Sequence, residues 1–128
     1  MNEVLIKSFV SSGGRHLVDD WLNGQRAVVR AAFLNIMTAL RDQPRSEWTR
    51  PDYGVLRRDC QGFGEVRFKV QNVEHRPIGF FLGDEVFVLV VFATERDSQF
   101  DPPTACEIAR KRRQNVRDNP RYSDVCDF

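Results

Sequence analysis

The chain has few of the features that mark secreted, metal-binding or membrane proteins. Its three cysteines, Cys60, Cys106 and Cys126, are an odd number without a Cys-x-x-Cys pair, which argues against a disulfide framework and against a zinc site. The longest apolar run, residues 86–93, is too short to span a bilayer, and the N-terminus lacks the basic start and long apolar middle of a signal peptide. We therefore expect a soluble protein of the reducing cytoplasm, without membrane contact.

Net charge is also small. The 19 Lys and Arg residues face 18 Asp and Glu residues, giving a formal net charge of +1, so a nucleic-acid partner would have to be recognised by a local cluster of charge. The 128 residues are 41% hydrophobic, enough for one compact core. We predict a single domain over residues 1–117 and a C-terminal tail over residues 118–128.

No cofactor or metal is predicted. Gly62-Phe63-Gly64 is too short and wrongly placed for a nucleotide-binding fingerprint, and no cluster of metal ligands or Ser-His-Asp arrangement stands out.

The N-terminal third predicts one strand and two helices. Residues 4–9 alternate in a β-rich pattern, and residues 17–22 place their apolar side chains on one side of a helix. Residues 25–41 repeat apolar side chains at the i, i+3, i+4, i+7 spacing of an amphipathic helix. The polar stretch 45–52 then reads as a long connection.

The aromatic residues divide into two groups. Trp21, Phe33 and Phe68 occupy apolar-periodic positions, which predicts that they belong to the core. Trp48 and Tyr53 belong to the long connection and are the better candidates for exposed aromatic side chains.

Beyond Tyr53 the period changes to two. Residues 64–71 have one apolar and one charged face, residues 75–82 form a second strand, and residues 85–94 read as a central strand because they are mostly apolar on both faces. Residues 104–117 read as an arginine-rich final helix. The predicted class is α+β, with two N-terminal helices and one C-terminal helix around an antiparallel sheet.

Three short segments, in this order and spacing, resemble the RelE/ParE superfamily of bacterial toxins, and most closely its phage-associated HigB-like branch. The segments are Gly62-Phe63-Gly64-Glu65-Val66-Arg67, His75-Arg76 and Val88-Leu89-Val90-Val91-Phe92. The resemblance covers roughly residues 3–117. It implies a RelE-like fold, a type II toxin–antitoxin system with a cognate antitoxin, and mRNA and the ribosome as partners; it says nothing of oligomeric state.

The resemblance also implies a site. Arg67, Arg76 and Arg96 stand where ribosome-dependent RNase members tend to place basic catalytic residues. In RNA cleavage the 2′-hydroxyl attacks the neighbouring phosphate, and positioned guanidinium groups can neutralise the charge of the transition state. Arginine suits this role because it stays charged and binds phosphate oxygens in pairs.

This chain departs from the family pattern at two places. The HigB-like branch usually has a Lys-Lys pair where this chain has Thr94-Glu95-Arg96, and the tyrosine of RelE is replaced in the region of Phe100-Asp101-Pro102. The general acid or base is therefore open. His75 is the first candidate because imidazole titrates near neutral pH, and Asp97 is the second.

Further basic residues are candidates for RNA binding, because a basic helix beside a basic strand face can bind phosphates even at low net charge. The alternative is that these residues are simply the solvated surface of a helix and a strand. The candidates are Arg57, Arg58, Lys69, Arg110, Lys111 and Arg113.

Three functions follow as hypotheses. The first is a metal-independent endoribonuclease that cuts mRNA on the ribosome. The second is a non-catalytic toxin of the same fold, like the ParE toxins that inhibit gyrase. The third is a degenerate phage-derived relative that acts only through protein contacts.

The tail, residues 118–128, allows two interpretations. It has no periodicity, which favours a disordered terminus. Alternatively, Tyr122, Val125 and Phe128 dock on the body and bring the tail's aspartates near the basic surface, where they would compete with RNA phosphate.

Overall fold

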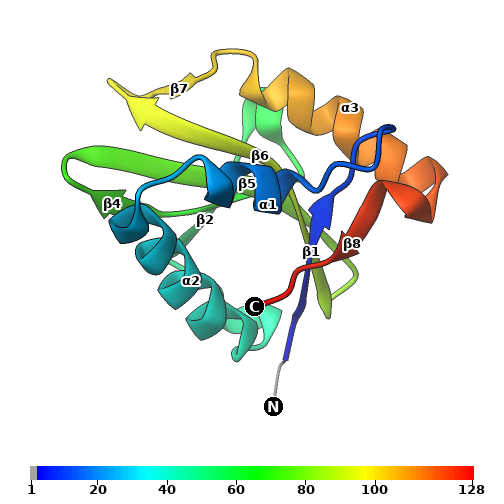
Figure 1. The fold of residues 1–128 in the computed structure, drawn as a ribbon, viewed down its shortest axis with the longest axis horizontal. Coiled ribbons are helices and arrows are strands. Elements are labelled where there is room, and N and C mark those ends of the chain that lie inside the picture. The colour runs from blue at the N-terminus through cyan, green and yellow to red at the C-terminus, as the bar shows by residue number, and fades with distance from the viewer. Residues whose placement is uncertain (1–2) are drawn as a thin grey trace.

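A computed structural model describes residues 3–128 as three α-helices and an eight-stranded sheet (Figure 1). The α+β class is therefore confirmed. The helices are α1 (Leu17–Asn23), α2 (Ala27–Arg41) and α3 (Ala105–Asp118). The strands are β1 (Leu5–Phe9), β2 (Tyr53–Val55), β3 (Gly64–Val66), β4 (Phe68–Val70), β5 (Val73–Leu82), β6 (Val86–Arg96), β7 (Gln99–Asp101) and β8 (Ser123–Val125).

The sheet is mixed rather than antiparallel throughout. Its order is β2-β3-β5-β6-β1-β8, with β4 on β5 and β7 on β6. The predicted meander of β3, β4, β5 and β6 is antiparallel, whereas β1 runs parallel to β6, with Leu5 opposite Val86. Parallel neighbours need a long crossover connection, and the helices between β1 and the meander supply one. The expectation of a purely antiparallel sheet is therefore wrong for this pair.

The predicted strand over residues 64–71 is interrupted at Arg67. The backbone N–H of Arg67 donates to Asp52 O at 2.8 Å, beside β2. Glu65 pairs with Ile78 before the interruption and Phe68 pairs with His75 after it. The register on β5 is the same on both sides, so the alternation of side chains continues across the break.

Each face of the sheet has its own core. On the face covered by α1 and α2, Phe33 and Phe87 are fully buried. On the face covered by α3, Phe63 and Phe80 pack with Ala105 of that helix. The predicted core residues lie in the first of these cores, and β6 contributes to both, as its continuous apolar sequence predicted. Those predicted residues are Trp21, Phe33 and Phe68.

Trp48 and Tyr53 are buried, contrary to prediction. Their exposed fractions are 6% and 7%, and Trp48 lies 5.0 Å from the ring of Phe81. The connection folds back against the sheet as a short 3₁₀ turn, η1 (Arg45–Glu47), followed by β2. Gly64 makes room, because a Cβ there would lie 1.8 Å from the Tyr53 hydroxyl. The polar composition of residues 45–52 gives no indication of this packing.

Two of the cysteines form a disulfide, which corrects the expectation from their spacing. Cys60 and Cys106 have Cα atoms 5.0 Å apart and are bonded, so the 3₁₀ turn η2 (Arg58–Cys60) is fixed to α3. The two residues are 46 positions apart in sequence, and tertiary packing alone brings them together. Cys126 is free and buried, and burial raises the pKa of its thiol to about 12.

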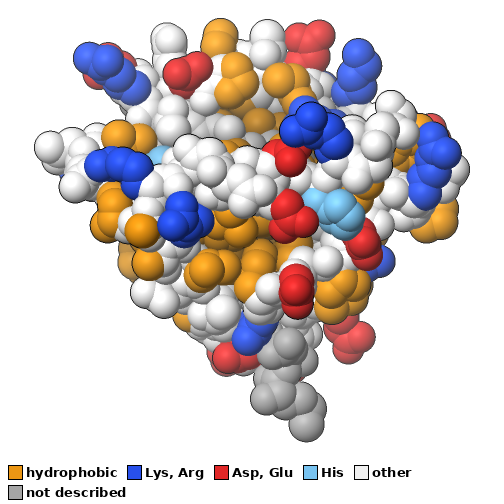
Figure 2. Space-filling view, in the orientation of Figure 1, with side chains coloured by type: hydrophobic (Ala, Val, Ile, Leu, Met, Phe, Trp, Pro, Cys, Tyr) orange, Lys and Arg blue, Asp and Glu red, His pale blue; other side chains and the backbone are white. Residues whose placement is uncertain are grey.

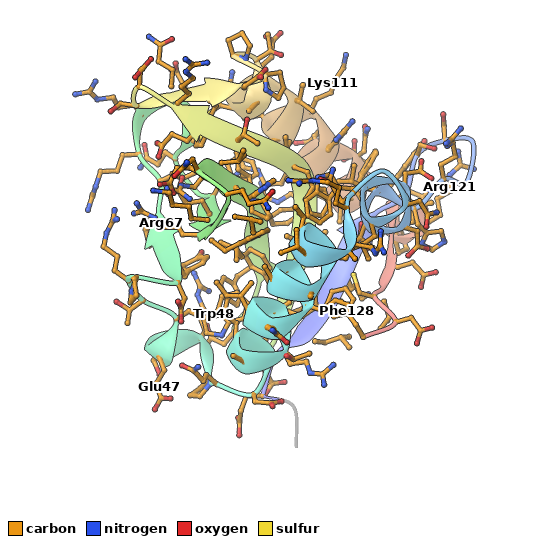
Figure 3. All side chains as sticks on the ribbon, turned by 60° about the vertical axis from the view of Figure 1, so that its left-hand side comes forward. Glu47, Trp48, Arg67, Lys111, Arg121 and Phe128 are labelled. Carbon is orange, nitrogen blue, oxygen red and sulfur yellow. A yellow bond between two sulfur atoms is a disulfide. The ribbon has the colours of Figure 1, made fainter. Side chains whose placement is uncertain are left out.

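The C-terminal segment packs on the body. A 3₁₀ turn, η3 (Pro120–Tyr122), precedes β8, which pairs antiparallel with β1. Tyr122 stacks on Phe9 at 6.2 Å. Phe128, labelled beside α2 in Figure 3, meets Phe33 of that helix at 5.6 Å. Val125, the third proposed anchor, is 49% exposed.

The aspartates of this segment lie in different places: Asp118 is the last residue of α3 and accepts a hydrogen bond from Gln114 Nε2 at 2.8 Å. Asp124 lies 3.7 Å from His16, beside β1. The docked interpretation is therefore confirmed for Tyr122 and Phe128, whereas the structure does not show the proposed approach of this aspartate to the basic surface. Among residues 3–128, no helix is both long and apolar enough to cross a membrane.

Candidate functional site

One end of the α3-covered face of the sheet is charged. Side chains two residues apart in a strand point to the same face, so Glu74 and Arg76 of β5 share a face. Glu65 and Arg67 join them from β3 and the break that follows it, since Arg67 and Arg76 both lie 3.5 Å from Glu65. The predicted charged face of residues 64–71 is thus confirmed, and it lies beyond the apolar contact with α3.

Arg76 is the buried centre of this end. Its side chain is 4% exposed, and its Nη2 lies 2.9 Å from Glu74 Oε2 and 3.3 Å from Glu95 Oε1. Its Nε lies 3.5 Å from Glu65 Oε2, and its Nη1 donates to His75 O at 2.9 Å. These contacts tie β3, β5 and β6 together. Because these contacts engage most of the N–H groups of the guanidinium, Arg76 stabilises the sheet and has few N–H groups left to bind a phosphate.

Beside Arg76 is an open hollow of about 350 Å³. Arg67, with a side chain 26% exposed, and Arg50 both lie over Gly54 of β2, and Lys69 projects nearby at 3.7 Å from Glu74. Within residues 3–128, Arg50 forms no ion pair with a carboxylate. The hollow therefore presents a cationic rim suited to an anion. Its lining residues are Arg50, Pro51, Arg67, Phe68, Lys69, Glu74 and Arg76.

His75 lies on the opposite face of the sheet. It is 7% exposed, its ring stacks on Phe68 at 4.9 Å, and it meets the edge of Trp21 at 6.1 Å. Burial, and then the charge of Arg76, lower the pKa of this imidazole. His75 is thus a neutral core residue near pH 7. The structure does not place it where it would exchange a proton with a group in the hollow.

Arg96 and Asp97 lie in the turn between β6 and β7. Their side chains are 93% and 94% exposed and 4.0 Å apart. They line a second hollow of about 830 Å³ that shares Glu74 with the first. The structure therefore brings Arg67 and Arg76 together through Glu65, but it does not bring Arg96 into the same cluster.

Three arginines of α3 form a row along one side of the helix: Arg110, Arg113 and Arg117, hereafter the arginine row. Arg113 lies over the ring of Phe63 at 4.2 Å, and Arg110 donates to the carbonyl of Asp59. Partial burial, and then the charges of Arg117 and Arg110, lower the pKa of Arg113. The row is a set of neighbouring like charges.

Arg112 faces the other way. It donates to Val90 O at 2.7 Å, and burial lowers its pKa. This arginine therefore supports the fold, while the arginine row remains on the helix side next to η2.

The predicted RNA-binding residues therefore occupy two places. Lys69 lies at the hollow. Arg57 and Arg58 are exposed at η2, which the disulfide fixes to α3, and Lys111 is exposed on α3 itself. Figure 3 shows Arg67 and Lys111 well apart on different elements. Any RNA that contacts both places must extend along the surface.

Several residues of the charged end were not identified from the sequence. Glu65 and Glu74 each precede an arginine by two positions, and this Glu-x-Arg spacing on a strand was an available signal for pairs on one face. Arg50 gave no such signal, because it reaches the hollow from the long connection. Glu95 reaches Arg76 only through the pairing of β5 with β6.

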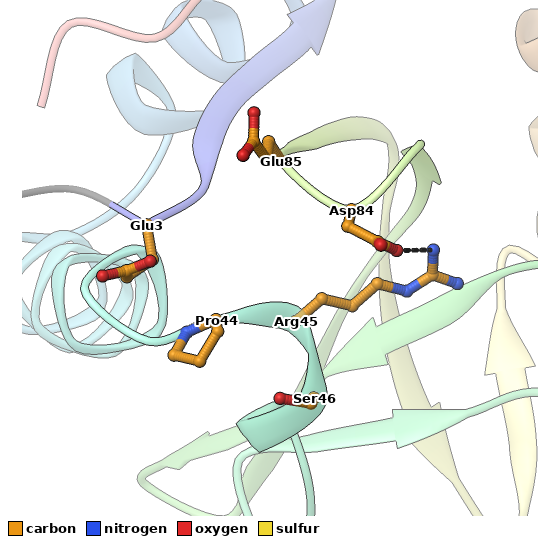
Figure 4. Close-up of a pocket in the computed structure, with 6 residues that line it drawn as sticks. All are labelled: Glu3, Pro44, Arg45, Ser46, Asp84 and Glu85. Carbon is orange, nitrogen blue, oxygen red and sulfur yellow. Dashed lines mark hydrogen bonds and ion pairs between the residues drawn. The ribbon is translucent and has the colours of Figure 1, made fainter.

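The hollow near the start of β1 offers less suitable chemistry for an anion. Three of the six residues that line this hollow of about 430 Å³ are acidic, and its one arginine, Arg45, is paired with Asp84 at 3.2 Å (Figure 4). On the face seen in Figure 2, cationic and acidic side chains are interspersed around an apolar central area.

Among residues 3–128, no group of three His, Cys, Asp or Glu side chains is arranged to hold a metal ion. No family model, curated protein or solved structure matches the chain.

Proposed function

We propose that the protein is the toxin of a type II toxin–antitoxin pair, with a RelE-like arrangement of helices and sheet, and that it cuts mRNA on the ribosome. The observation that carries this proposal is the hollow rimmed by Arg50, Arg67 and Lys69 and anchored by Arg76. Two guanidinium groups and an ammonium group around one open space suit a phosphate that gains charge in the transition state.

The order of the elements supports the same proposal. A strand, two helices, a meander and a terminal helix follow one another as the resemblance implies. The proposal includes a cognate antitoxin and a cytoplasmic location. The Cys60–Cys106 disulfide is the observation that stands against this location, because disulfides are rare in reducing compartments.

A second candidate function is favoured by the position of His75. Because this imidazole lies in the core, the hollow has no imidazole to act as general acid or base. A non-catalytic toxin of the same fold, such as a gyrase inhibitor, does not need one. A degenerate phage-derived protein that acts only through protein contacts remains the third.

Induced expression in bacteria, with growth and mRNA integrity followed together, separates these functions. We expect arrest with mRNA cleavage, and we expect Arg67→Ala to lower the cleavage rate by about 100-fold because a charge-stabilising donor is lost. Arg96→Ala is the matched control: it also removes an arginine from this end of the sheet, but one that is 93% exposed and outside the hollow. Arrest with intact mRNA and inhibited gyrase would favour the second function, and absence of arrest the third.

A further inference from the structure

Glu65 is paired with two of the arginines that line the charged hollow, Arg67 and Arg76. It belongs to β3, between Gly54 of β2 and Ile78 of β5, and its side chain is 5% exposed. Its Oε2 lies 3.5 Å from Nε of Arg67 and 3.5 Å from Nε of Arg76. Its Oε1 is buried and has no hydrogen-bond partner among the described residues.

Stability alone does not account for a carboxylate here. Burial raises the pKa of Glu65, and the nearby charges of Arg76 and Arg50 offset this effect only in part. Burying a carboxylate without a full set of hydrogen bonds is costly, and an apolar residue in such a place is often at least as stable. The contacts that Glu65 makes with Arg67 and Arg76 therefore offer a better explanation for its presence.

Glu65 is paired with two arginines that differ in exposure and in their other contacts. Arg76 is buried and is also paired with Glu74 and Glu95; its contact with Glu65 is an ion pair, because its buried Nε has no hydrogen-bond partner among the described residues. Arg67 is partly exposed, and its Nε faces Glu65. Using the Nε of Arg67 in this way leaves its terminal N–H groups for another anion, since a guanidinium has five N–H donors in a fixed fork.

We propose that Glu65 is a positioning residue that orients Arg67 toward the hollow, so that Arg67 and the neighbouring Arg50 bind one RNA phosphate together. This inference deepens the proposed function and rests on it for the choice of RNA as the anion. Glu65 itself does not line the hollow, so its action passes through the arginines.

The proposal predicts a change in anion affinity that is opposite in sign to the change expected from charge alone. Removing a negative charge near the hollow should tighten the binding of an anion by Coulomb attraction alone. Removing a residue that orients Arg67 should weaken it. The experiment is to measure the affinity of Glu65→Gln for a short single-stranded RNA oligonucleotide by fluorescence anisotropy.

We expect Glu65→Gln to bind the oligonucleotide at least about 10-fold more weakly than the parent, the loss expected when Arg67 no longer makes one charge-assisted hydrogen bond to the phosphate. Glu95→Gln is the matched control, because Glu95 also contacts Arg76 but does not contact Arg67. Its affinity should be equal to that of the parent or higher. If Glu65→Gln binds as tightly as the parent or more tightly, the proposal is wrong.

A double-mutant cycle distinguishes positioning from general support of the fold. In an Arg67→Ala background, Glu65→Gln should cause no further loss of affinity, whereas additive losses would overturn the proposal. Glu65→Asp, which keeps the charge but shortens the side chain, should recover part of the affinity. Should Glu65→Gln fail to give a cooperative thermal transition, Glu65→Asp carries the cycle in its place, and binding equal to that of the parent would overturn the proposal.

Binding is measured without cleavage, so the two proposals fail separately. If the parent leaves mRNA intact but Glu65→Gln still loses oligonucleotide affinity, the positioning role stands and the endoribonuclease proposal falls. If the parent cleaves mRNA and Glu65→Gln retains full oligonucleotide affinity, the endoribonuclease proposal stands and the positioning role falls.

Discussion

His75 and Arg76 are neighbours in β5 and lie in opposite environments. His75 stacks in the aromatic layer beneath α1 and α2, where it touches Phe68 and Trp21. Arg76 is equally buried, but three glutamates surround it on the other face. One face of the sheet is thus held by apolar packing and the other, at this end, by opposed charges. A face held by charges can also present charges to a partner, and this is the face that carries the hollow.

The largest expected effect on stability comes from removing the positive charge of Arg76, at the charged end of the α3-covered face. Arg76→Met leaves Glu65 buried without its main counter-charge, so we expect the free energy of unfolding to fall by about 3–5 kcal/mol. Urea unfolding at neutral pH measures it. Arg96→Met, at a position 93% exposed, should stay within about 0.5 kcal/mol of the parent. An equally small change for Arg76→Met would show that opposed charges do not hold this face.

The disulfide lies on the α3-covered side of the sheet, because it fixes η2 to α3. Closing a loop of this length restricts the unfolded chain, so reduction or Cys106→Ser should lower the free energy of unfolding by about 2–4 kcal/mol. In reducing buffer the parent and Cys106→Ser should be nearly equal, which serves as the control. A parent whose stability is the same with and without reductant would contradict the expectation.

The same experiment tests whether the faces are independent. Trp21 and Trp48 both belong to the core beneath α1 and α2. The tryptophan fluorescence of the folded protein should therefore be the same before and after reduction. A shift in the folded-state spectrum would show that the two faces are coupled.

Most of the regular elements were predictable because periodicity reports burial. The structure confirms the apolar stripe of α2, the alternation around Arg67 and the central position of β6. The features that were missed depend on contacts between segments far apart in sequence. Trp48 is buried because a polar connection folds back onto the sheet. No local sequence pattern predicts this long-range contact.

The candidate site was predictable to a smaller extent. Arg67 was found because the charged face of its strand is visible in the alternation of residues. The chemistry of His75 suggests a general acid or base, yet alternation along β5 places it on the face opposite Arg76, and this argument follows from the sequence. The burial of Arg76 among Glu65, Glu74 and Glu95 required the pairing of β3, β5 and β6, which sequence alone does not give.

The smallest expected effect comes from the apolar face and depends on pH. The pKa of His75 is lowered from its ordinary value of 6.5 by burial and by Arg76. As pH falls below 6.5, the unfolded chain binds a proton at this residue before the folded chain does, so the contribution of His75 to stability is lost. It is fully present above that value.

His75→Phe keeps a ring against Phe68 and Trp21 but removes the titration. Urea unfolding of both proteins from about pH 7.5 to about pH 5.5 should therefore show the parent losing stability relative to the variant as pH falls. Other titrating groups are common to both proteins and cancel in the difference. Parallel curves would mean that the imidazole is not held neutral in the core. Because His75 faces away from the hollow, the variant should also bind single-stranded RNA as the parent does, and a loss of RNA binding would show that the two faces of β5 do not act separately.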